Sequence, residues 1–251
     1  MKSLKLAFGC VILLGGILLC FVGCVQRSLL YFPTHEVGEE AASASGLTRW
    51  LINGAYTGYA HRVENPRRIW LFMHGNGGQA ATRSYMLHCL SPLDSIYILE
   101  YPGYGDRPGK PSQQSLNHAA LIAYRALVSA YGASKICVLG ESLGSGPASF
   151  LATTENPPAR IVLVVPFDVL EDVAQEKFPY LPVGLIMLDR WNNIDALKSY
   201  QGRVDIYGAK FDQVIPVAHA RNLARSVPGA HYHEFDGDHG WANGNQVDLS
   251  N

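Results

Sequence analysis

The sequence predicts one α/β domain with a mostly parallel central sheet, helices on both faces of that sheet and a small cap. Its 251 residues are 48% hydrophobic and 16% charged, so the chain can bury a sizeable core. Short, continuous apolar runs are typical of strands that are buried on both faces, as in a parallel sheet. Helical patterns alternate with these runs, which indicates helices that cover both faces of the sheet.

The first half of the chain predicts four strands, near residues 48–52, 55–62, 69–73 and 96–99. The first two are short and are expected to form an antiparallel start to the sheet. A helix is expected between the last two. A longer helix begins near Pro111 and Ser112, because small and apolar residues recur at helical spacing from Leu116 to Ala130.

The second half predicts four more strands, near residues 136–139, 161–165, 204–207 and 231–235. A helix of small residues is expected after the first of these strands, and another begins near Pro216, between the last two. Residues 167–202 contain Pro179 and Pro182 and do not form another strand–helix unit in this pattern. They are therefore expected to form the small cap. No internal repeat and no second domain is predicted.

The distribution of charge and cysteine excludes several classes of protein. Residues 1–34 carry three basic residues and no acid: Lys2, Lys5 and Arg27. Residues 35–251 carry 17 basic and 21 acidic residues, a net charge of −4. A mildly acidic domain lacks the basic surface that binds nucleic acid, so no nucleic-acid partner is expected. Only Cys89 and Cys137 lie C-terminal to Thr34, which gives neither a disulfide framework nor the spacing of a metal site.

Residues 6–25 form a run of twenty uncharged, mostly apolar residues, the length that a helix needs to cross a bilayer. Basic residues precede this run, so a spanning anchor would leave the N-terminus in the cytoplasm and the domain on the extracytoplasmic side. A secretory signal has a similar pattern, and Phe21-Val22-Gly23-Cys24 resembles a bacterial lipobox, whose cysteine is lipidated after cleavage. Residues 1–34 are therefore predicted to be a membrane anchor or a lipoprotein signal, and residues 35–251 the folded domain.

The segment Gly140-Glu141-Ser142-Leu143-Gly144 follows a predicted strand and precedes a predicted helix. This G-x-S-x-G pattern places a serine at a sharp turn, where the strand and helix backbones approach closely and glycine is needed on both sides. The serine oxygen then lies at the carboxyl edge of the sheet, where ligands bind in open α/β folds. Ser142 is the candidate nucleophile, and the alternative is a Gly/Ser turn without activity.

A serine nucleophile needs an imidazole that accepts its proton and a third group that orients the ring. In this architecture the chain order is serine, acid, histidine, so the candidate base follows the last strand. His239 lies there, in the segment Gly237-Asp238-His239-Gly240. His231 and His233 have the i, i+2 spacing of two ligands on one strand face, but no third ligand accompanies them. Packing or surface roles are favoured for both, and no metal site is predicted.

Two aspartates are candidates for the orienting acid. Asp212, just past the penultimate predicted strand, is favoured, and Asp168, after the strand at residues 161–165, is the alternative. Asp236 and Asp238 are close to the histidine in sequence and are expected to be turn residues.

The glycine-rich segment His74-Gly75-Asn76-Gly77-Gly78 directly follows a predicted buried strand. A turn of this kind can direct a main-chain N–H group at the oxyanion that develops in acyl transfer. The candidate oxyanion donors are the N–H groups of Asn76 and Leu143. His74 is expected to hold the loop. A phosphate-binding loop is disfavoured, because neither G-x-x-x-x-G-K-[ST] nor G-x-G-x-x-G is present.

Further stretches accompany these motifs: Gln26-Arg27-Ser28-Leu29-Leu30-Tyr31-Phe32-Pro33, Glu100-Tyr101-Pro102-Gly103-Tyr104-Gly105, Pro108-Gly109-Lys110-Pro111-Ser112, Asp189-Arg190-Trp191 and the segment at residues 212–216. Together they resemble the α/β-hydrolase superfamily and, within it, the BEM46-like membrane-associated serine hydrolases. The resemblance spans nearly the whole chain. It implies the α/β-hydrolase fold, a triad of Ser142, Asp212 and His239, and esterase, thioesterase or lipid hydrolase activity without a cofactor. One departure is expected, because the chain ends at Asn251, soon after His239, and the terminal helix usual in this fold has no counterpart.

The expected function is hydrolysis of a carboxylic ester or thioester, through an acyl-enzyme, by a catalytic domain at residues 35–251. The expected partners are a small-molecule or lipid acyl substrate and a membrane, which the N-terminal segment would contact. No oligomeric state is predicted. The alternatives are a peptidase on the same fold and a catalytically inactive, membrane-tethered protein that binds a lipid or a partner. The complete set of triad candidates disfavours the inactive protein, since binding alone does not require all three.

Overall fold

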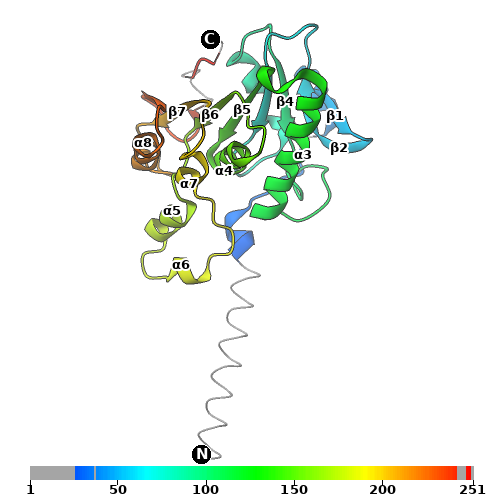
Figure 1. The fold of residues 1–251 in the computed structure, drawn as a ribbon. Helices are drawn as coiled ribbons and strands as arrows, with labels where there is room; N and C mark the ends of the chain where they lie inside the picture. Colours follow the sequence, from blue (N-terminus) through cyan, green and yellow to red (C-terminus); the bar gives the residue numbers. More distant parts are fainter. Residues whose placement is uncertain (1–25, 37, 242–246, 250–251) are drawn as a thin grey trace, which may run out of the picture.

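A computed structural model describes residues 26–36, 38–241 and 247–249, and an eight-stranded sheet forms the centre of this part of the chain (Figure 1). The strands are β1 (Thr48–Ile52), β2 (Ala55–His61), β3 (Ile69–Met73), β4 (Ser95–Leu99), β5 (Ile136–Glu141), β6 (Arg160–Val164), β7 (Arg203–Ala209) and β8 (His231–Phe235). Their order in the sheet is β1-β2-β4-β3-β5-β6-β7-β8. Each strand lies within two residues of its predicted position, so the strand predictions are confirmed.

The sheet is mostly parallel, as predicted. β2 pairs antiparallel with β1 and with β4, and all the remaining pairs, from β4-β3 to β7-β8, are parallel. The register places the carboxyl ends of neighbouring strands side by side: Met73 pairs with Gly140, the residue before the end of β5, and Ala209 pairs with Phe235. The loops that follow β3, β5, β6, β7 and β8 therefore emerge at one edge of the sheet.

Seven helices are described besides the helical turn at residues 26–30 and the 3-10 turns. They are α2 (Glu39–Ala44), α3 (Gln113–Tyr131), α4 (Ser145–Phe150), α5 (Leu170–Lys177), α6 (Val183–Ile186), α7 (Asn193–Leu197) and α8 (Val217–Ser226). The longest, α3, begins where the sequence predicts, because Ser112 and Ser115 form a reciprocal capping box. The 3-10 turns are η1 (Ala80–Thr82), η2 (Ser84–His88), η3 (Ala133–Lys135), η4 (Ser142–Gly144) and η5 (Leu151–Thr153).

The two faces of the sheet are covered differently. On one face α3, α4, α7 and α8 bury their apolar sides against the strands. On the other face the cover consists of α2, η1, η2 and the buried side chains of Trp241, Val247 and Leu249. Every residue of β3, β5 and β6 is buried. Since burial of one Leu, Ile or Phe side chain contributes about 1.5–3 kcal/mol, these central strands dominate the stability of the sheet.

The helix expected between β3 and β4 is replaced by η1 and η2, so that prediction is wrong. The turns close through hydrogen bonds from Thr82 N to Gln79 O, Arg83 N to Ala80 O and Met86 N to Arg83 O. The Thr82 hydroxyl also donates to Gln79 O (2.8 Å). Side-chain bonds of this kind compete with the α-helical pattern.

The predicted cap at residues 167–202 contains α5, α6 and α7, and Figure 1 shows α5 and α6 below the sheet. On one side, Lys177 Nζ donates to Gln213 O (2.8 Å), which joins the end of α5 to the loop after β7. On the other side, α7 packs beside α4, where the buried Asn193 donates to Ser145 Oγ (3.0 Å). The cap is therefore attached to loops at the carboxyl edge of the sheet.

Residues 26–34, grouped with the anchor in the sequence analysis, pack on the domain. Residues 26–30 are helical and Tyr31 is buried, with its hydroxyl donating to Asp189 Oδ2 (3.0 Å) in the cap. Within the described ranges, no helix is long and apolar enough to cross a bilayer. The predicted N-terminal hydrophobic segment, at residues 6–25, lies outside those ranges.

The C-terminal residues that are described also pack on the sheet. Leu249 N donates to Cys89 O (2.8 Å), and Leu249 is fully buried. The prediction about a terminal helix concerns residues 240–251, of which 242–246 and 250–251 lie outside the described part of the chain.

Candidate active site

Ser142 occupies a sharp turn between β5 and the helical residues that follow it. Its φ of 51° lies in the left-handed region, which costs a residue other than glycine about 1–3 kcal/mol. The flanking glycines allow this turn. A Cβ atom on Gly144 would lie 2.0 Å from Met73 O, and one on Gly140 would lie 2.6 Å from Gly144 O. The G-x-S-x-G pattern is thus explained by the close approach of β5, α4 and the end of β3.

Buried polar contacts support this turn from the side of the cap. Ser145 Oγ donates to Ser142 O (2.7 Å) and accepts a hydrogen bond from Asn193 Nδ2 (3.0 Å). The same Asn193 amide donates to Phe167 O (2.8 Å), at the start of the cap. Contacts of this kind hold the strained turn in place.

His239 lies between Ser142 and Asp212. Its Nδ1 atom donates to Asp212 Oδ2 (2.7 Å), and its Nε2 atom is 2.9 Å from Ser142 Oγ. Because the carboxylate accepts at Nδ1, the ring presents Nε2 as an acceptor for the serine hydroxyl. The structure therefore brings together the three residues that the sequence analysis selects, in the geometry that general-base activation of a serine requires.

Asp212 is held rigidly at the start of the loop after β7. Its Oδ1 atom accepts hydrogen bonds from the main-chain N–H groups of Val214 and Ile215, both at 2.8 Å. The Asp212 side chain is only 1% exposed, whereas that of His239 is 23% exposed. The acid is thus fixed by its own loop, and the imidazole faces an opening to solvent.

Asp168, the alternative acid, contacts a different histidine. Its Oδ1 atom accepts from His219 Nδ1 on α8 (2.6 Å), and its Oδ2 atom accepts from Asn222 (2.6 Å). Burial alone would raise the pKa of Asp168, but the hydrogen bonds from His219, Asn222 and Val169 N outweigh it and hold the pKa below its ordinary value. The hydrogen bond to Asp168 outweighs burial at His219 and raises its pKa. Asp168 therefore belongs to a separate buried ion pair.

The segment after β3 begins beside the serine turn, since a Cβ atom on Gly144 would lie 2.8 Å from His74 O. The Asn76 side chain anchors this loop: its Nδ2 atom donates to Leu30 O, and its Oδ1 atom accepts from Phe32 N (2.9 Å) and from the Tyr104 hydroxyl (2.8 Å). The segment at residues 26–34 thus connects the candidate oxyanion loop to the cap.

Glu141, one residue before the serine, was not selected by the sequence analysis. Its Oε2 atom accepts from Gly75 N (3.1 Å) and from the Tyr85 hydroxyl (2.8 Å), and its Oε1 atom accepts from Trp241 Nε1 (3.3 Å). Burial and the neighbouring Glu141 carboxylate keep the pKa of Tyr85 well above its ordinary value, so this phenol stays a donor. One buried carboxylate thereby joins β5, the candidate oxyanion loop and the segment that carries His239.

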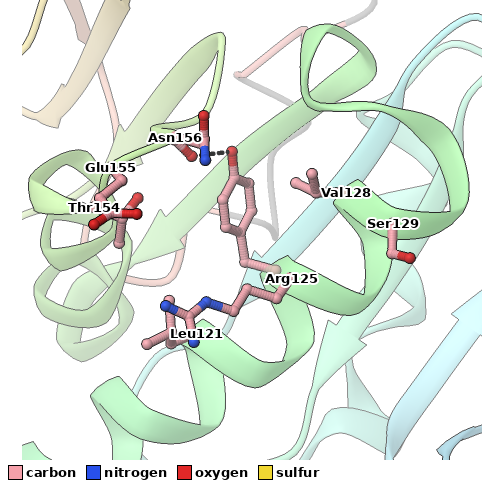
Figure 2. Close-up of a pocket in the computed structure, with 8 residues that line it drawn as sticks. Leu121, Arg125, Val128, Ser129, Thr154, Glu155 and Asn156 are labelled. Atoms are coloured by element: carbon pink, nitrogen blue, oxygen red, sulfur yellow. Dashed lines mark hydrogen bonds between the residues drawn. The ribbon is translucent and has the colours of Figure 1, made fainter.

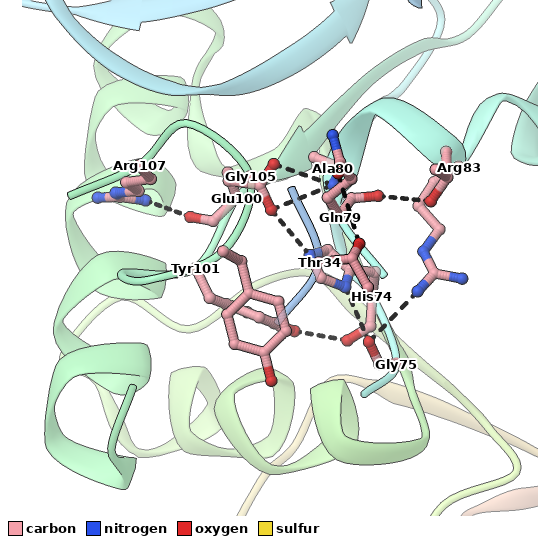
Figure 3. A network of polar contacts seen from close by, with 12 residues as sticks. Thr34, His74, Gly75, Gln79, Ala80, Arg83, Glu100, Tyr101, Gly105 and Arg107 are labelled. Carbon is pink, nitrogen blue, oxygen red and sulfur yellow. Dashed lines mark hydrogen bonds and ion pairs between the residues drawn. The ribbon is translucent and has the colours of Figure 1, made fainter. Parts of the chain in front are cut away.

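His74 holds its loop, as expected. It is fully buried, donates from Nδ1 to Gly75 O (2.8 Å) and lies with Nε2 3.4 Å from Glu100 Oε1 (Figure 3). Glu100 also accepts from Ala80 N (3.1 Å), and Tyr101 donates to His74 O (2.7 Å). These contacts tie the carboxyl ends of β3 and β4 to each other behind the candidate oxyanion loop.

Two further features lie away from this site. Within the described ranges, no three His, Cys, Asp or Glu side chains are grouped as metal ligands, and His233 stacks on Tyr207 with ring centroids 4.6 Å apart. A hollow of about 250 Å³ lies between α3 and the residues after η5 (Figure 2). It is lined by Tyr124, Arg125 and Asn156, among others, close to the start of β6 and thus at the edge of the sheet opposite to Ser142.

Comparison with known sequences gives distant relatives. No protein-family model matches the chain. The chain is 29% identical over 217 residues to the uncharacterized protein Rv2307c of Mycobacterium tuberculosis, and the match covers 82% of this chain and 77% of that protein. It is 25% identical over 198 residues to lysophosphatidylserine lipase ABHD12 of Mus musculus, a match that covers 70% of this chain. The chain spans only 50% of the length of that lipase.

Comparison with solved structures identifies the fold. An alpha-beta hydrolase from Vibrio vulnificus superposes with a TM-score of 0.67 at 17% identity and covers 83% of both chains. Esterase Pf2001 from Pyrococcus furiosus superposes with a TM-score of 0.62 at 13% identity, covering 84% of this chain and 95% of the esterase. Together with the strand order and the serine turn, these similarities show that the chain has the α/β-hydrolase fold.

Proposed function

We propose that this protein is a serine hydrolase of the BEM46-like group that cleaves a carboxylic ester or thioester through a covalent acyl-enzyme. The observation that carries the proposal is the position of one imidazole, with Nε2 2.9 Å from Ser142 Oγ and Nδ1 2.7 Å from Asp212 Oδ2. A hydroxyl at the carboxyl edge of an α/β sheet, hydrogen-bonded to an oriented imidazole, has the arrangement of an activated nucleophile.

The proposed reaction has two halves. In the first, Ser142 Oγ attacks the acyl carbonyl while His239 Nε2 takes the hydroxyl proton, and the N–H groups of Asn76 and Leu143 stabilise the oxyanion. Collapse of this intermediate breaks the bond to the alcohol or thiol, which leaves with the proton from His239. In the second half, water attacks the acyl-enzyme with the same proton transfers, and the carboxylic acid is released. Asp212 orients the ring and stabilises the imidazolium throughout.

The distant relatives support a lipid substrate for this reaction. The similar protein from Mus musculus is named a lysophosphatidylserine lipase, and a structural neighbour is an esterase. A lysophospholipid carries one acyl ester, which is the bond that the proposed chemistry cleaves. We therefore propose a lipid acyl ester as the substrate class.

The first test is covalent labelling by a fluorophosphonate probe, which reacts rapidly only with an activated serine. We expect Ser142→Ala to abolish labelling of the full chain. Ser129→Ala, which changes an exposed serine on α3, is the matched control and should label like the wild type. Undiminished labelling of Ser142→Ala would identify another serine as the nucleophile.

We also propose that residues 1–25 attach the protein to a membrane, with the catalytic domain on the extracytoplasmic side. The full chain should then stay in the membrane fraction through a high-salt wash, because twenty uncharged residues partition into lipid independently of ionic strength. Cys24→Ala distinguishes the two forms of attachment: loss of lipid labelling and of cleavage indicates a lipoprotein, and no change indicates a spanning anchor. Recovery of the full chain in the soluble fraction would contradict both.

A further inference from the structure

Exposed apolar side chains of the described residues are concentrated around the cap. Five of them form what is called here the apolar cap surface: Phe178, Tyr180, Leu181, Leu185 and Leu188. Tyr180 is 98% exposed and Leu185 is 82% exposed, which is unusual for side chains that large. By contrast, the described surface away from the cap and the segments bonded to it exposes only three large apolar side chains, Leu51, Leu93 and Ile122.

The N-terminal segment meets the domain at this surface. Gln26 Nε2 donates to Ile186 O (3.1 Å), and Leu188 N donates to Gln26 Oε1 (2.7 Å), so Gln26 spans the end of α6. Arg27 forms an ion pair with Asp189 (3.2 Å) directly beyond it. Figure 1 shows the blue turn at residues 26–30 beside the yellow segment of the cap that contains α6.

Gln26 is also the residue that follows the uncharged run at residues 6–25. Because neighbouring residues of a chain are only one peptide unit apart, a run that enters a bilayer leaves the next residue at the surface of that bilayer. The two hydrogen bonds of Gln26 then hold α6 at the same surface. An apolar patch of this kind gains free energy when it enters the boundary between lipid headgroups and acyl chains.

We propose that the apolar cap surface docks onto a phospholipid bilayer, the same bilayer to which the N-terminal segment attaches the protein. The cap follows β6, at the carboxyl edge of the sheet that carries Ser142 and His239. Two exposed apolar residues, Phe211 and Val214, flank Asp212 on the loop to which Lys177 bonds, and they extend the apolar surface towards the site. Docking thus holds this edge against the lipid. If the protein has the proposed function, on which this last step rests, a lipid acyl ester passes from the bilayer to Ser142 without crossing water.

Photochemical labelling tests the docking without reference to activity. The full chain is reconstituted in phosphatidylcholine vesicles that contain a fraction of phosphatidylcholine with a diazirine on its acyl chain. Trypsin cleaves after Lys177 and Arg190, so one peptide, residues 178–190, carries the whole apolar cap surface. We expect lipid adducts on this peptide and none on the peptide at residues 50–62, which carries the exposed Leu51. Adducts confined to residues 1–25, as expected if a second copy of the chain covered the cap, would overturn the proposal.

A pair of matched variants tests the consequence for activity. Leu181→Asp with Leu185→Asp places two charges on the apolar cap surface, and Leu51→Asp with Leu93→Asp places two charges on exposed apolar positions elsewhere. The measured quantity is the ratio of hydrolysis of 4-methylumbelliferyl oleate in vesicles to hydrolysis of p-nitrophenyl butyrate in water. We expect this ratio to fall about tenfold or more for the cap variant and to stay within about twofold for the control. Equal ratios would contradict the proposal.

The two tests separate the two proposals. If the wild type hydrolyses neither ester while peptide 178–190 is labelled, the proposed chemistry fails and the docking surface stands. If both esters are hydrolysed and the peptide carries no adduct, the docking surface fails and the proposed chemistry stands.

Discussion

Two aspartate–histidine pairs lie at the same edge of the sheet and differ in what faces the second ring nitrogen. In one pair, His239 binds Asp212 through Nδ1 and faces the Ser142 hydroxyl with Nε2. In the other, His219 binds Asp168 through Nδ1 and lies with Nε2 3.3 Å from Glu176 Oε2. The first ring joins an acid to a hydroxyl, and the second ring joins two acids.

This difference separates a candidate catalytic base from a histidine that is held between two acids. An imidazole between two carboxylates binds its proton more tightly, which agrees with the raised pKa of His219, and neither of its nitrogens faces a hydroxyl that it could deprotonate. An imidazole between a carboxylate and a hydroxyl keeps one nitrogen free to accept the hydroxyl proton. The residue on the far side of the ring therefore matters as much as the orienting acid.

The largest effect is expected from Asp212→Asn. In the serine-protease template, the corresponding amide leaves the geometry intact and lowers kcat by about 10⁴, because it favours the wrong tautomer of the histidine. Asp212→Asn should therefore lower kcat for p-nitrophenyl butyrate by roughly three to four orders of magnitude, with KM little changed. Asp168→Asn is the matched control and should stay within about tenfold of the wild type. The opposite ranking, with both variants folded by circular dichroism, would mean that Asp168 serves the reaction.

An intermediate effect is expected from Glu141→Gln, which tests a positioning residue. The carboxylate accepts three hydrogen bonds, from Gly75 N, the Tyr85 hydroxyl and Trp241 Nε1, and an amide offers only one acceptor oxygen. At least one donor then loses its partner, at a cost of about 1–3 kcal/mol. If this cost falls on the transition state, kcat decreases by about 10- to 100-fold while KM changes little.

The control for Glu141 is Tyr85→Phe, which removes one of the three donors and leaves the carboxylate in place. It should lower kcat by less than about fivefold. A Glu141→Gln enzyme with wild-type kcat would show that the contacts of Glu141 with the oxyanion loop and the Trp241 segment serve stability alone.

The fold could be predicted largely from the sequence because most strands are short apolar runs. The run at residues 69–73 is strand β3 with the same bounds. The 3-10 turns between β3 and β4 could not be predicted from the sequence pattern. Hydrogen bonds to residues far away in the sequence determine the structure of that segment. Ala80 N donates to Glu100 Oε1 (3.1 Å), and the Tyr85 hydroxyl donates to Glu141 Oε2 (2.8 Å). These tertiary contacts override the local helical preference.

For the candidate site, the G-x-S-x-G motif selected Ser142, and chain order together with position after the last two strands selected Asp212 and His239; the structure brings the three together. The contacts of Glu141 could not be predicted, because its three donors are 66, 56 and 100 residues away in the sequence. The apolar cap surface could not be predicted from the sequence for a related reason. Its leucines resemble core residues in the sequence, and only their exposure in the folded domain shows that they face outward.

The smallest expected effect concerns the pH dependence of stability, and it tests the second histidine pair. The hydrogen bond to Asp168 raises the pKa of His219, so this stabilisation is complete below about pH 6.5, the unfolded pKa, and is lost as the pH rises through the folded pKa. The lowered pKa of Asp168 gives a contribution that is complete above about pH 4 and is lost as the pH falls further. Both contributions are present together only between these limits. The difference in free energy of unfolding between wild type and Asp168→Asn, measured by urea denaturation, should therefore be largest near pH 5–6 and should shrink towards pH 9.

The control is Asp195→Asn, which breaks an exposed pair with Lys198. Its difference in free energy of unfolding from the wild type should show little dependence on pH. If the difference in free energy of unfolding between wild type and Asp168→Asn grew from pH 6 to pH 9, His219 would be neutral in the folded protein. Glu176 and Asp168 would then not hold its proton.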